Sequence, residues 1–417
     1  MISSIRLFSS KNEIEGSINL PESKSISNRV LIIKYLSGSD FEIGSISKAA
    51  DSQLLSEIIY QLKFFKTDKM IFNLKNAGTP LRFLTAILAT ISGEFVINCD
   101  QRMKSRPIGD LVESLRYLGA DIQYLENEMF PPLRINGKNL HSKSIEIDAT
   151  NSSQYISALM LIAPLLPSGL EINMLGNIAS KPYISLTISL MQQSGISIKL
   201  QENRIIVEKG NYSMPTIDME FDWSSAAFFY ELAAISNKAS ILLKGLKTNS
   251  LQGDAIIPTL FEKLGIITVF EKDGVRISKA SEAKKNIHFD FSSFPDIALP
   301  FIVSCAALGV IGTFTGLESL KIKECNRVEA LSTELSKFDY DFRDTGLGEW
   351  VLLNSCAVDI HNIKPKKIIS IETYGDHRVA MAFAPLVLIS KELKIKNPEV
   401  VAKSFPNFWN EFGKIVC

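Results

Sequence analysis

The sequence predicts an α/β fold of two or three domains built around a repeated unit. The chain has 417 residues, and about 100–200 residues make an ordinary domain. Hydrophobic residues make up 46% and charged residues 22%, which is typical of a globular protein and not of a disordered chain. The third observation is a recurring pattern of an amphipathic helix, a small or glycine-containing turn, a strand, a polar turn and another strand.

Three copies of this unit have a glycine where the helix ends. Glycine suits that position because it adopts a positive φ without a Cβ clash. The predicted turns are at Gly119, Gly195 and Gly265, in VESLRYLGADIQYLENEMFPPLRING, TISLMQQSGISIKLQENRIIVEKG and IPTLFEKLGIITVFEKDGVRISKA.

Two further copies are predicted without glycine. ALSTELSKFDYDFRDTGLGEWVLLNS turns at Phe338, and a weaker early copy, LLSEIIYQLKFFKTDKMIFNLKN, turns around Lys63. Most turns lie about 70–76 residues apart, and a fixed period indicates one supersecondary module used several times. Six units fit the chain, and we expect the N-terminal segments SSIRLF and EGSINL to supply strands to the sixth. The two ends of the chain then meet in one domain; chance spacing in an ordinary α/β chain is the alternative.

Charge and cysteine content exclude several classes of protein. Lys+Arg and Asp+Glu both number 45, which argues against a chain that coats nucleic acid or an anionic membrane. The five cysteines form no CxxC pair, so we expect free thiols in the cytoplasm and no zinc site. MISSIRLFSSKNEIEG contains no long apolar stretch, so we expect no signal peptide.

One uncharged apolar stretch, from Ile297 to Phe314, is long enough to cross a membrane. Pro300, Gly309 and Gly312 interrupt it. We therefore predict a buried helix followed by a buried strand.

Polar segments that lead into apolar helices supply candidate binding residues. A small polar residue before a helix is an N-cap, and a helix N-terminus presents free N–H groups and partial positive charge that suit an anion. For each segment alone, a capped helix start facing solvent is the alternative. The candidates are Lys24, Ser25 and Arg29 in SKSISNR, Gly78 and Arg82 in NAGTPLR, Arg106 in RMKSRPIGD, and Ser152, Ser153 and Gln154 in NSSQ.

The second half of the chain adds carboxylates. Asp296 opens PDIALPFIVSCAALG, Glu324 lies in KIKECNR beside Lys323 and Arg327, and YGDHRVAMAF contains Asp376, His377 and Arg378. Carboxylates among cations suit general acid–base work on an anionic substrate; a buried or capping ion pair is the alternative. The sequence contains no HExxH, no paired His/Cys cluster and no GxGxxG after a strand, so we expect no metal and no cofactor.

Taken in order, eight segments resemble the 5-enolpyruvylshikimate-3-phosphate synthases. The resemblance covers nearly the whole chain, and eight motifs in series are far more specific than any one of them. They are LPESKSISNR, NAGTPLRFLTA, RMKSRPIGDL, SSQYISALM, SKPYISLTISLM, QGDAIIPTL, KIKECNRVEAL and GDHRVAMAFA.

The resemblance implies an enolpyruvyl transferase-like fold of two domains, each with three βαβαββ-type units around buried helices. One domain is expected at 19–220, and the other at 1–18 plus 221–417. The ligands would bind in a cleft between the domains, which would close on them and exclude water. A cytoplasmic monomer without nucleic-acid or membrane partners is expected.

The implied reaction belongs to chorismate and aromatic amino acid biosynthesis. The 5-hydroxyl of shikimate 3-phosphate attacks phosphoenolpyruvate, and a tetrahedral intermediate then loses phosphate. Asp296 matches the base, Glu324 matches the proton donor, and Lys24 matches a lysine that contacts both substrates.

The remaining matches are substrate contacts. Ser25, Arg29, Ser152, Ser153, Ser180 and Lys323 match contacts to shikimate 3-phosphate; Gly78, Arg106, Arg327, Arg378 and Lys403 match contacts to phosphoenolpyruvate; Gln154 matches a residue near both; Tyr183 and Arg82 match residues that line the cleft.

Some positions depart from the family pattern. Cys325 and Asn326 replace Thr and Asp, and loss of that charge is expected to loosen Arg327. The other departures are Glu22, Lys75 and Ser319.

Two rival functions stay open. The sister enzyme that acts on UDP-N-acetylglucosamine usually has a reactive cysteine where this chain has Gln101. A non-catalytic anion-binding protein with the same fold is the second rival, and the retention of Asp296, Glu324 and Lys24 together argues against it.

Overall fold

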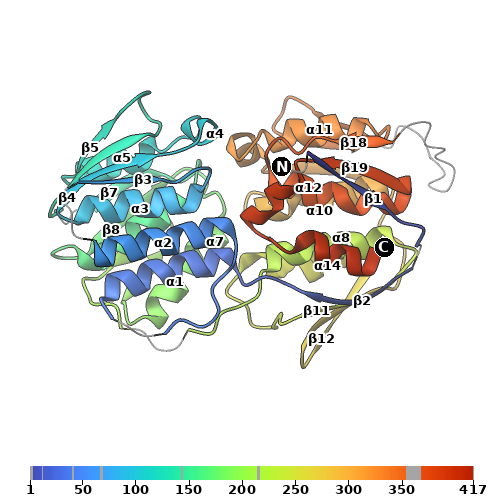
Figure 1. Cartoon of the computed structure of the whole chain (residues 1–417), viewed down its shortest axis with the longest axis horizontal. Helices are drawn as coiled ribbons and strands as arrows, with labels where there is room; N and C mark the ends of the chain where they lie inside the picture. The colour runs from blue at the N-terminus through green and yellow to red at the C-terminus, as the bar shows by residue number, and fades with distance from the viewer. Residues whose placement is uncertain are drawn as a thin grey trace. The chain divides into compact units, whose positions relative to one another are not determined.

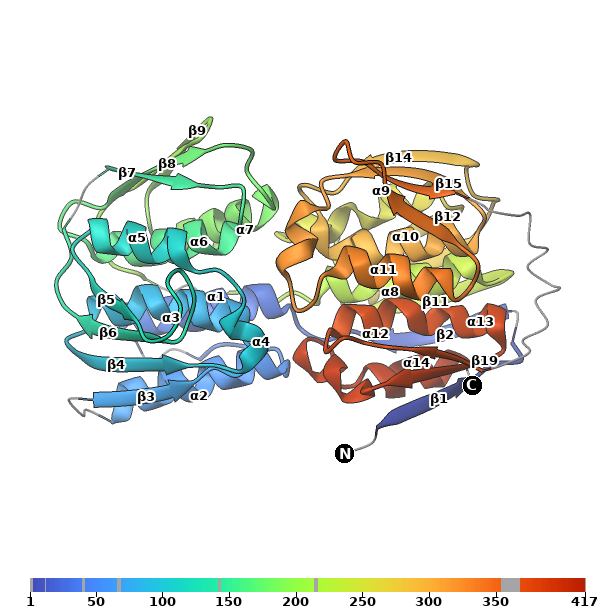
Figure 2. The same cartoon turned by 90° about the horizontal axis from the view of Figure 1, so that it is seen from above.

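The computed structural model describes residues 3–11, 13–39, 42–65, 69–141, 144–213, 217–353 and 368–416. The chain forms two compact units. We call Ser23–Met219 the inserted unit, and Met1–Glu22 with Glu220–Cys417 the terminal unit. Within each unit the helices run through the middle and the sheets lie outside them (Figures 1 and 2).

The boundaries between the units were predicted at residues 18/19 and 220/221. The structure places them at 22/23 and 219/220. Leu20 belongs to the core of the terminal unit, and the Asp222 amide donates to the carbonyl of Pro21 at 2.9 Å. These contacts hold residues 20–22 in the terminal unit.

The inserted unit contains two four-stranded sheets with the same order of elements. In each, the first two strands are parallel and the last two extend the sheet antiparallel, giving β3-β4-β6-β5 and β7-β8-β10-β9. The first set is β3 (Lys69–Asn73), α3 (Gly78–Thr90), β4 (Gly93–Asn98), α4 (Gln101–Lys104), α5 (Gly109–Tyr117), β5 (Asp121–Tyr124) and β6 (Leu133–Gly137). The second set is β7 (Ser144–Asp148), α6 (Ser153–Ile162), β8 (Leu170–Leu175), α7 (Lys181–Gln193), β9 (Ile198–Gln201) and β10 (Arg204–Val207).

A further helix pair precedes these sheets. It consists of α1 (Lys24–Ser37) and α2 (Ala50–Phe64), and no strand accompanies it within the described part of the chain.

The terminal unit repeats the βαβαββ order twice, with sheets β14-β15-β17-β16 and β12-β13-β11-β2. The first set is β14 (Asn286–Asp290), α10 (Ala298–Ala307), β15 (Ile311–Thr315), α11 (Arg327–Ser336), β16 (Asp341–Asp344) and β17 (Trp350–Leu353). The second set is β2 (Glu13–Asn19), α8 (Trp223–Ile235), β11 (Lys238–Lys244), α9 (Ile257–Glu262), β12 (Ile266–Glu271) and β13 (Gly274–Lys279).

A third sheet of the terminal unit brings the two ends of the chain together. Its order is β1-β19-β18. Its elements are β1 (Ser4–Phe8), β18 (Ile369–Ile371), α12 (His377–Phe383), α13 (Val387–Ser390), β19 (Glu392–Lys396) and α14 (Phe408–Val416). The expected meeting of the two chain ends in one domain is confirmed, because β1 runs antiparallel to β19. The expectation that both N-terminal segments join the sixth unit is wrong for the second segment, because β2 runs parallel to β11 in a different sheet.

The glycine turns are confirmed, and the turn predicted at Phe338 is wrong by one residue. Gly119, Gly195 and Gly265 have φ of 102°, 84° and 86°. In the fourth copy the left-handed residue is Asp339, at φ 63°, and not Phe338; a short polar side chain tolerates this conformation better. In the early copy α2 ends at Phe64, beside the predicted turn around Lys63, but α3 follows β3 directly, so this copy lacks its second strand.

The apolar stretch in the second half is a buried helix and a strand, as predicted. Every residue of α10 is buried, and β15 buries Gly312 and Phe314. Over the described ranges, no helix has both the length and the apolar character that a membrane crossing needs. Cys99, Cys305 and Cys325 are buried free thiols, whereas Cys356 and Cys417 lie outside the described residues.

Candidate active site

Five predicted residues converge in the terminal unit, each at the start of a helix or the end of a short helical turn. Asp296 lies in the turn Pro295–Ile297 that leads into α10. Arg327 is the first residue of α11 and Arg378 the second of α12. Lys403 ends the short helix Pro398–Lys403, and Glu324 precedes α11 by three positions.

Arg327 is the centre of this cluster. Its Nη1 lies 3.4 Å from Asp296 Oδ1, its Nη2 3.0 Å from Glu324 Oε2, and its Nε 2.7 Å from Asp376 Oδ2. The residue is 1% exposed. Burial acts to lower the pKa of Arg327, but the charges of Asp376, Glu324 and Asp296 outweigh it and raise the pKa above its usual value. Arg327 is therefore a fixed cation that holds three carboxylates in place.

Each of the two predicted acid–base residues also has a second cationic partner. Arg378 Nη2 lies 3.2 Å from Asp296 Oδ2, and Arg378 Nη1 donates to the Asp296 carbonyl at 2.8 Å. Lys403 Nζ lies 2.9 Å from Glu324 Oε1. The cluster thus combines three carboxylates, two of them the predicted acid–base residues, with three cations, and such a combination suits acid–base work on an anionic substrate.

Asp376 has a larger structural role in the cluster than the sequence analysis gave it. Its Oδ1 accepts from the Arg378 amide at 2.8 Å and from Arg327 Nη2 at 3.3 Å, and the side chain is fully buried. Cys325 Sγ donates to its Oδ2 at 3.7 Å. The motif GDHR contained the signal, but the partner of Asp376 lies 49 positions away in the sequence.

Asp254 is a second acid that the sequence analysis missed. Ser224 Oγ donates to its Oδ2. Burial, together with the charge of Asp296, raises the pKa of Asp254 to about 7. Its segment, QGD, was among the eight motifs, yet nothing local indicates that Asp254 lies close enough to Asp296 to feel its charge.

The expectation that Asn326 loosens Arg327 finds no support in the contacts. Asn326 is the N-cap of α11, where its side chain accepts from the Glu329 amide at 3.3 Å. Arg327 has three carboxylate partners of its own.

In the inserted unit, Arg29 joins three helices. From α1, its Nε donates to Thr187 Oγ1 in α7 at 2.7 Å, and its Nη2 donates to Ser157 Oγ in α6 at 3.2 Å. Nη2 also donates to the Tyr183 carbonyl at 3.2 Å, and Nη1 donates to the Ser25 carbonyl at 2.9 Å. Burial lowers the pKa of Arg29 to about 10. Arg29, which was predicted as a ligand contact, therefore also joins the helices through hydrogen bonds.

Gly78, Arg82 and Arg106 lie together at the start of α3. A Cβ on Gly78 would lie 2.8 Å from Arg106 Nη1 and 3.0 Å from Arg82 Nη1. Arg82 Nη1 donates to the Gly78 carbonyl at 3.2 Å, and its Nη2 donates to the Pro107 carbonyl at 2.8 Å. The absence of a side chain at Gly78 gives two guanidinium groups access to this backbone.

The other predicted residues of the inserted unit occupy helix starts. Gln154 Nε2, in α6, donates to Thr79 Oγ1 in α3 at 3.2 Å. Lys24 Nζ lies 3.4 Å from Asp51 Oδ2, and Asp51 is a partner that the sequence analysis missed. Ser152 caps α6, Ser153 is its first residue, and Ser180 precedes α7 at φ 55°. In the terminal unit, Lys323 follows the turn Glu318–Ile322.

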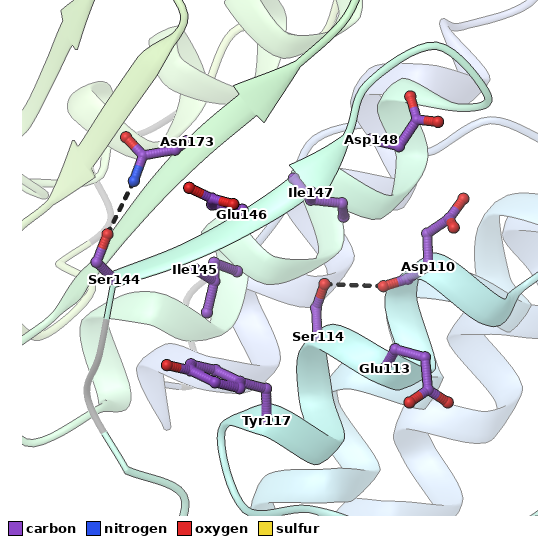
Figure 3. Close-up of a pocket in the computed structure, with 10 residues that line it drawn as sticks. All are labelled: Asp110, Glu113, Ser114, Tyr117, Ser144, Ile145, Glu146, Ile147, Asp148 and Asn173. Atoms are coloured by element: carbon purple, nitrogen blue, oxygen red, sulfur yellow. Dashed lines mark hydrogen bonds between the residues drawn. The ribbon is translucent and has the colours of Figure 1, made fainter.

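A separate cavity in the inserted unit contains none of the predicted residues. It has a volume of about 510 Å³ and lies beside α5 and β7 (Figure 3). Four carboxylates line it, from Asp110, Glu113, Glu146 and Asp148. A negative lining does not suit substrates that are anions.

Comparison with known proteins places this geometry in a family. The family model described as EPSP synthase (3-phosphoshikimate 1-carboxyvinyltransferase) matches residues 9–412. The chain belongs to the EPSP synthase family. Its members are enzymes, and the motifs that the sequence analysis assigned to that family all lie inside the matched range.

Relatives and solved structures agree with this placement. A 3-phosphoshikimate 1-carboxyvinyltransferase of Bacteroides fragilis is 41% identical over 415 residues, covering 98% of this chain and 97% of the relative. The enzyme of that name from Haemophilus influenzae is 33% identical over 429 residues, covering 96% of each chain. The EPSP synthase of Acinetobacter baumannii has a TM-score of 0.77 at 21% identity, covering 99% of this chain and 98% of that one. The two-domain enolpyruvyl transferase-like fold expected from the sequence is confirmed.

Proposed function

We propose that this chain transfers the enolpyruvyl group of phosphoenolpyruvate to the 5-hydroxyl of shikimate 3-phosphate and releases phosphate. The observation that supports it most directly is the arrangement of Asp296 and Glu324 around Arg327, with Arg378 and Lys403 as their second partners. Family membership supplies the substrates, and this cluster supplies groups of the kind that the reaction requires.

The proposed chemistry needs one base and one acid. Asp296 accepts the proton of the 5-hydroxyl while the oxygen of that hydroxyl attacks C2 of phosphoenolpyruvate. Glu324 donates a proton to the methylene carbon, which becomes a methyl group. In the second step the Glu324 carboxylate takes a proton back from that methyl group, the C–O bond to phosphate breaks with its electron pair leaving on phosphate, and the enolpyruvyl ether remains. Each general acid or base contributes about 10²–10⁴-fold to the rate.

The cations have the proposed task of binding two substrates that each carry phosphate and carboxylate groups. Guanidinium groups suit both because they donate two parallel hydrogen bonds. Arg327, Arg378, Lys403, Arg106 and Gly78 are assigned to phosphoenolpyruvate; Ser25, Arg29, Ser152, Ser153, Ser180 and Lys323 to shikimate 3-phosphate; Lys24 and Gln154 to both.

A phosphate-release assay tests the reaction. With both substrates present, the wild type should release phosphate, and omission of either substrate should abolish release. UDP-N-acetylglucosamine in place of shikimate 3-phosphate should give none; release with it would favour the sister enzyme. Binding of both substrates without any release would favour the non-catalytic protein.

Variants of the two acids test their roles. Asp296→Asn and Glu324→Gln should each lower kcat by about 10²–10⁴-fold. Asp290→Asn, at the exposed end of β14, is the matched control and should keep normal turnover. Near-normal turnover in either acid variant would overturn its assigned role.

We also propose a monomer located in the cytoplasm. The three described thiols are all free and buried, which agrees with a reducing compartment. Light scattering during size-exclusion chromatography tests the monomer, since a mass near 46.3 kDa is expected.

A further inference from the structure

We propose that Glu334 and Tyr374 are positioning residues for this reaction, because they fix the turn that leads to Asp376 and Arg378. This inference rests on the proposed function and adds to it two residues that no motif assigned. The Tyr374 hydroxyl donates to Glu334 Oε1 at 2.7 Å.

The geometry of α11 makes this contact part of a two-point attachment. Arg327 begins the helix, and Glu334 follows seven positions later. Seven residues make about two turns, so both side chains lie on one face of the helix. Arg327 binds Asp376, while Glu334 accepts from the Glu372 amide at 3.3 Å and from Tyr374. One helix face therefore holds the segment 372–376 at both ends.

The backbone of that segment is in a conformation that needs such support. Tyr374 has φ of 55° and Gly375 has φ of 70°. A left-handed conformation is unfavourable for a residue with a Cβ, and it persists only where the surroundings over-determine it. The bond from the Tyr374 hydroxyl to a buried carboxylate provides that restraint at the strained residue itself.

A shift of this turn would move two groups of the candidate site together. Asp376 is the N-cap of α12, directly after the turn, and Arg378 is the second residue of that helix. Asp376 orients Arg327, and Arg378 bonds Asp296. The turn therefore controls both guanidinium groups that are assigned to phosphoenolpyruvate in the terminal unit.

The partners of Glu334 indicate that this carboxylate stabilises the segment 372–376. The side chain is fully buried, and a buried carboxylate is costly unless it is paired. Lys337 Nζ pairs with it at 2.6 Å and also donates to the Ser370 carbonyl at 2.9 Å. Apart from Lys337, which directly follows α11, the described hydrogen-bond donors to this carboxylate are the Glu372 amide and the Tyr374 hydroxyl.

Tyr374→Phe tests the inference because it removes only the hydroxyl, from a side chain that is 38% exposed. We expect the KM for phosphoenolpyruvate to rise about five- to tenfold, while the KM for shikimate 3-phosphate stays within twofold. The matched control is Tyr230→Phe, which removes a hydroxyl contact to Thr268 in the same unit and should leave both KM values unchanged. An unchanged KM for phosphoenolpyruvate in Tyr374→Phe would overturn the positioning role.

A double-mutant cycle that combines Tyr374→Phe with Glu334→Gln tests whether the two residues act through the hydrogen bond between them. If the two residues act through their shared bond, the double variant should resemble the worse single variant; fully additive effects would contradict this route. The wild type measured in the same assay separates the two proposals. No phosphate release from the wild type would remove the proposed function, whereas an active wild type with an unaffected Tyr374→Phe variant would remove only this inference.

Discussion

Glu231 is a single residue that works against the stability of the terminal unit. It lies in α8 with no exposed surface, and neither carboxylate oxygen has a hydrogen-bond partner among the described residues. Burial raises the pKa of Glu231 well above its usual value. The folded protein therefore keeps this carboxyl group neutral, while the unfolded chain ionises it above about pH 4.5, so stability falls as the pH rises toward the folded pKa.

Glu231→Gln should remove this pH dependence. In urea unfolding between pH 5 and pH 7, the variant should gain stability relative to the wild type by up to about 1.4 kcal/mol per pH unit. Glu411→Gln is the control with the opposite sign. Burial acts to raise the pKa of Glu411, but hydrogen bonds from Lys414 and Asn19 outweigh it and lower the pKa. That variant should lose stability at pH 7, and equal behaviour of the two would contradict the assignment.

Gly78→Ala should weaken the binding of phosphoenolpyruvate without unfolding the protein. The new Cβ would lie 2.8 Å from Arg106 Nη1, and that guanidinium is the end of a flexible side chain that moves aside. A loss of about 1 kcal/mol, or roughly fivefold in KM, is expected. Gly413→Ala in α14 is the control, because nothing lies within 4 Å of its Cβ. The same KM in both variants would argue against contact at Gly78.

At the scale of residues, the sequence predicted the groups that lie in motifs and missed their partners. Asp296 and Glu324, which the structure brings together at Arg327, could be singled out as candidates because each precedes a helix among cations. Asp51, Asp254 and Glu334 were missed because the residues they contact are 27 to 40 positions away. The sequence alone does not show whether an aspartate or glutamate faces solvent or a buried guanidinium group.

At the scale of elements, one guanidinium sets the arrangement of α1, α6 and α7. Arg29→Lys should destabilise the inserted unit by about 2–3 kcal/mol, because one ammonium does not reach acceptors in three helices. Urea unfolding without substrates measures this. Arg204→Lys, exposed on β10 and paired with Glu171, is the control and should change stability by less than about 0.5 kcal/mol. A small effect of Arg29→Lys would show that packing alone aligns the helices.

Element boundaries were predictable where backbone conformation demands a residue type. Three glycines ended their helices at the predicted positions because a positive φ favours glycine. The fourth turn is at Asp339 and not at Phe338. Residues other than glycine adopt a positive φ only occasionally, so their presence in a sequence does not mark the position of such a turn. The meeting of the two chain ends in one domain was predicted by counting units and not from any local pattern, and the structure adds the partner strands, β1 and β19.

At the scale of the whole molecule, the terminal unit should require residues 1–22. These contribute Leu7, Ile14, Ile18 and Leu20 to its core. At roughly 1.5–3 kcal/mol each they supply about 6–12 kcal/mol, which equals the whole stability of a typical domain. Residues 220–417 expressed alone should therefore not fold cooperatively, whereas 23–219 should, as measured by circular dichroism during thermal unfolding.

Joining residues 1–22 to 220–417 through a short glycine linker should restore folding. Glu22 pairs with Phe221 in an isolated bridge, so the junction spans a small distance. Failure of the joined chain to fold, while 23–219 folds, would show that the terminal unit depends on the inserted one.

The pairing of β1 with β19 has a consequence for synthesis on the ribosome. Residues 4–8 cannot pair until residues 392–396 have been synthesised. Likewise β2 cannot pair until β11, which follows the inserted unit in the sequence, has been synthesised. Long waits of this kind slow folding and leave strand edges open to wrong neighbours. The inserted unit meets no such delay, so it should emerge and fold first, and the earliest strands translated should be among the last to dock.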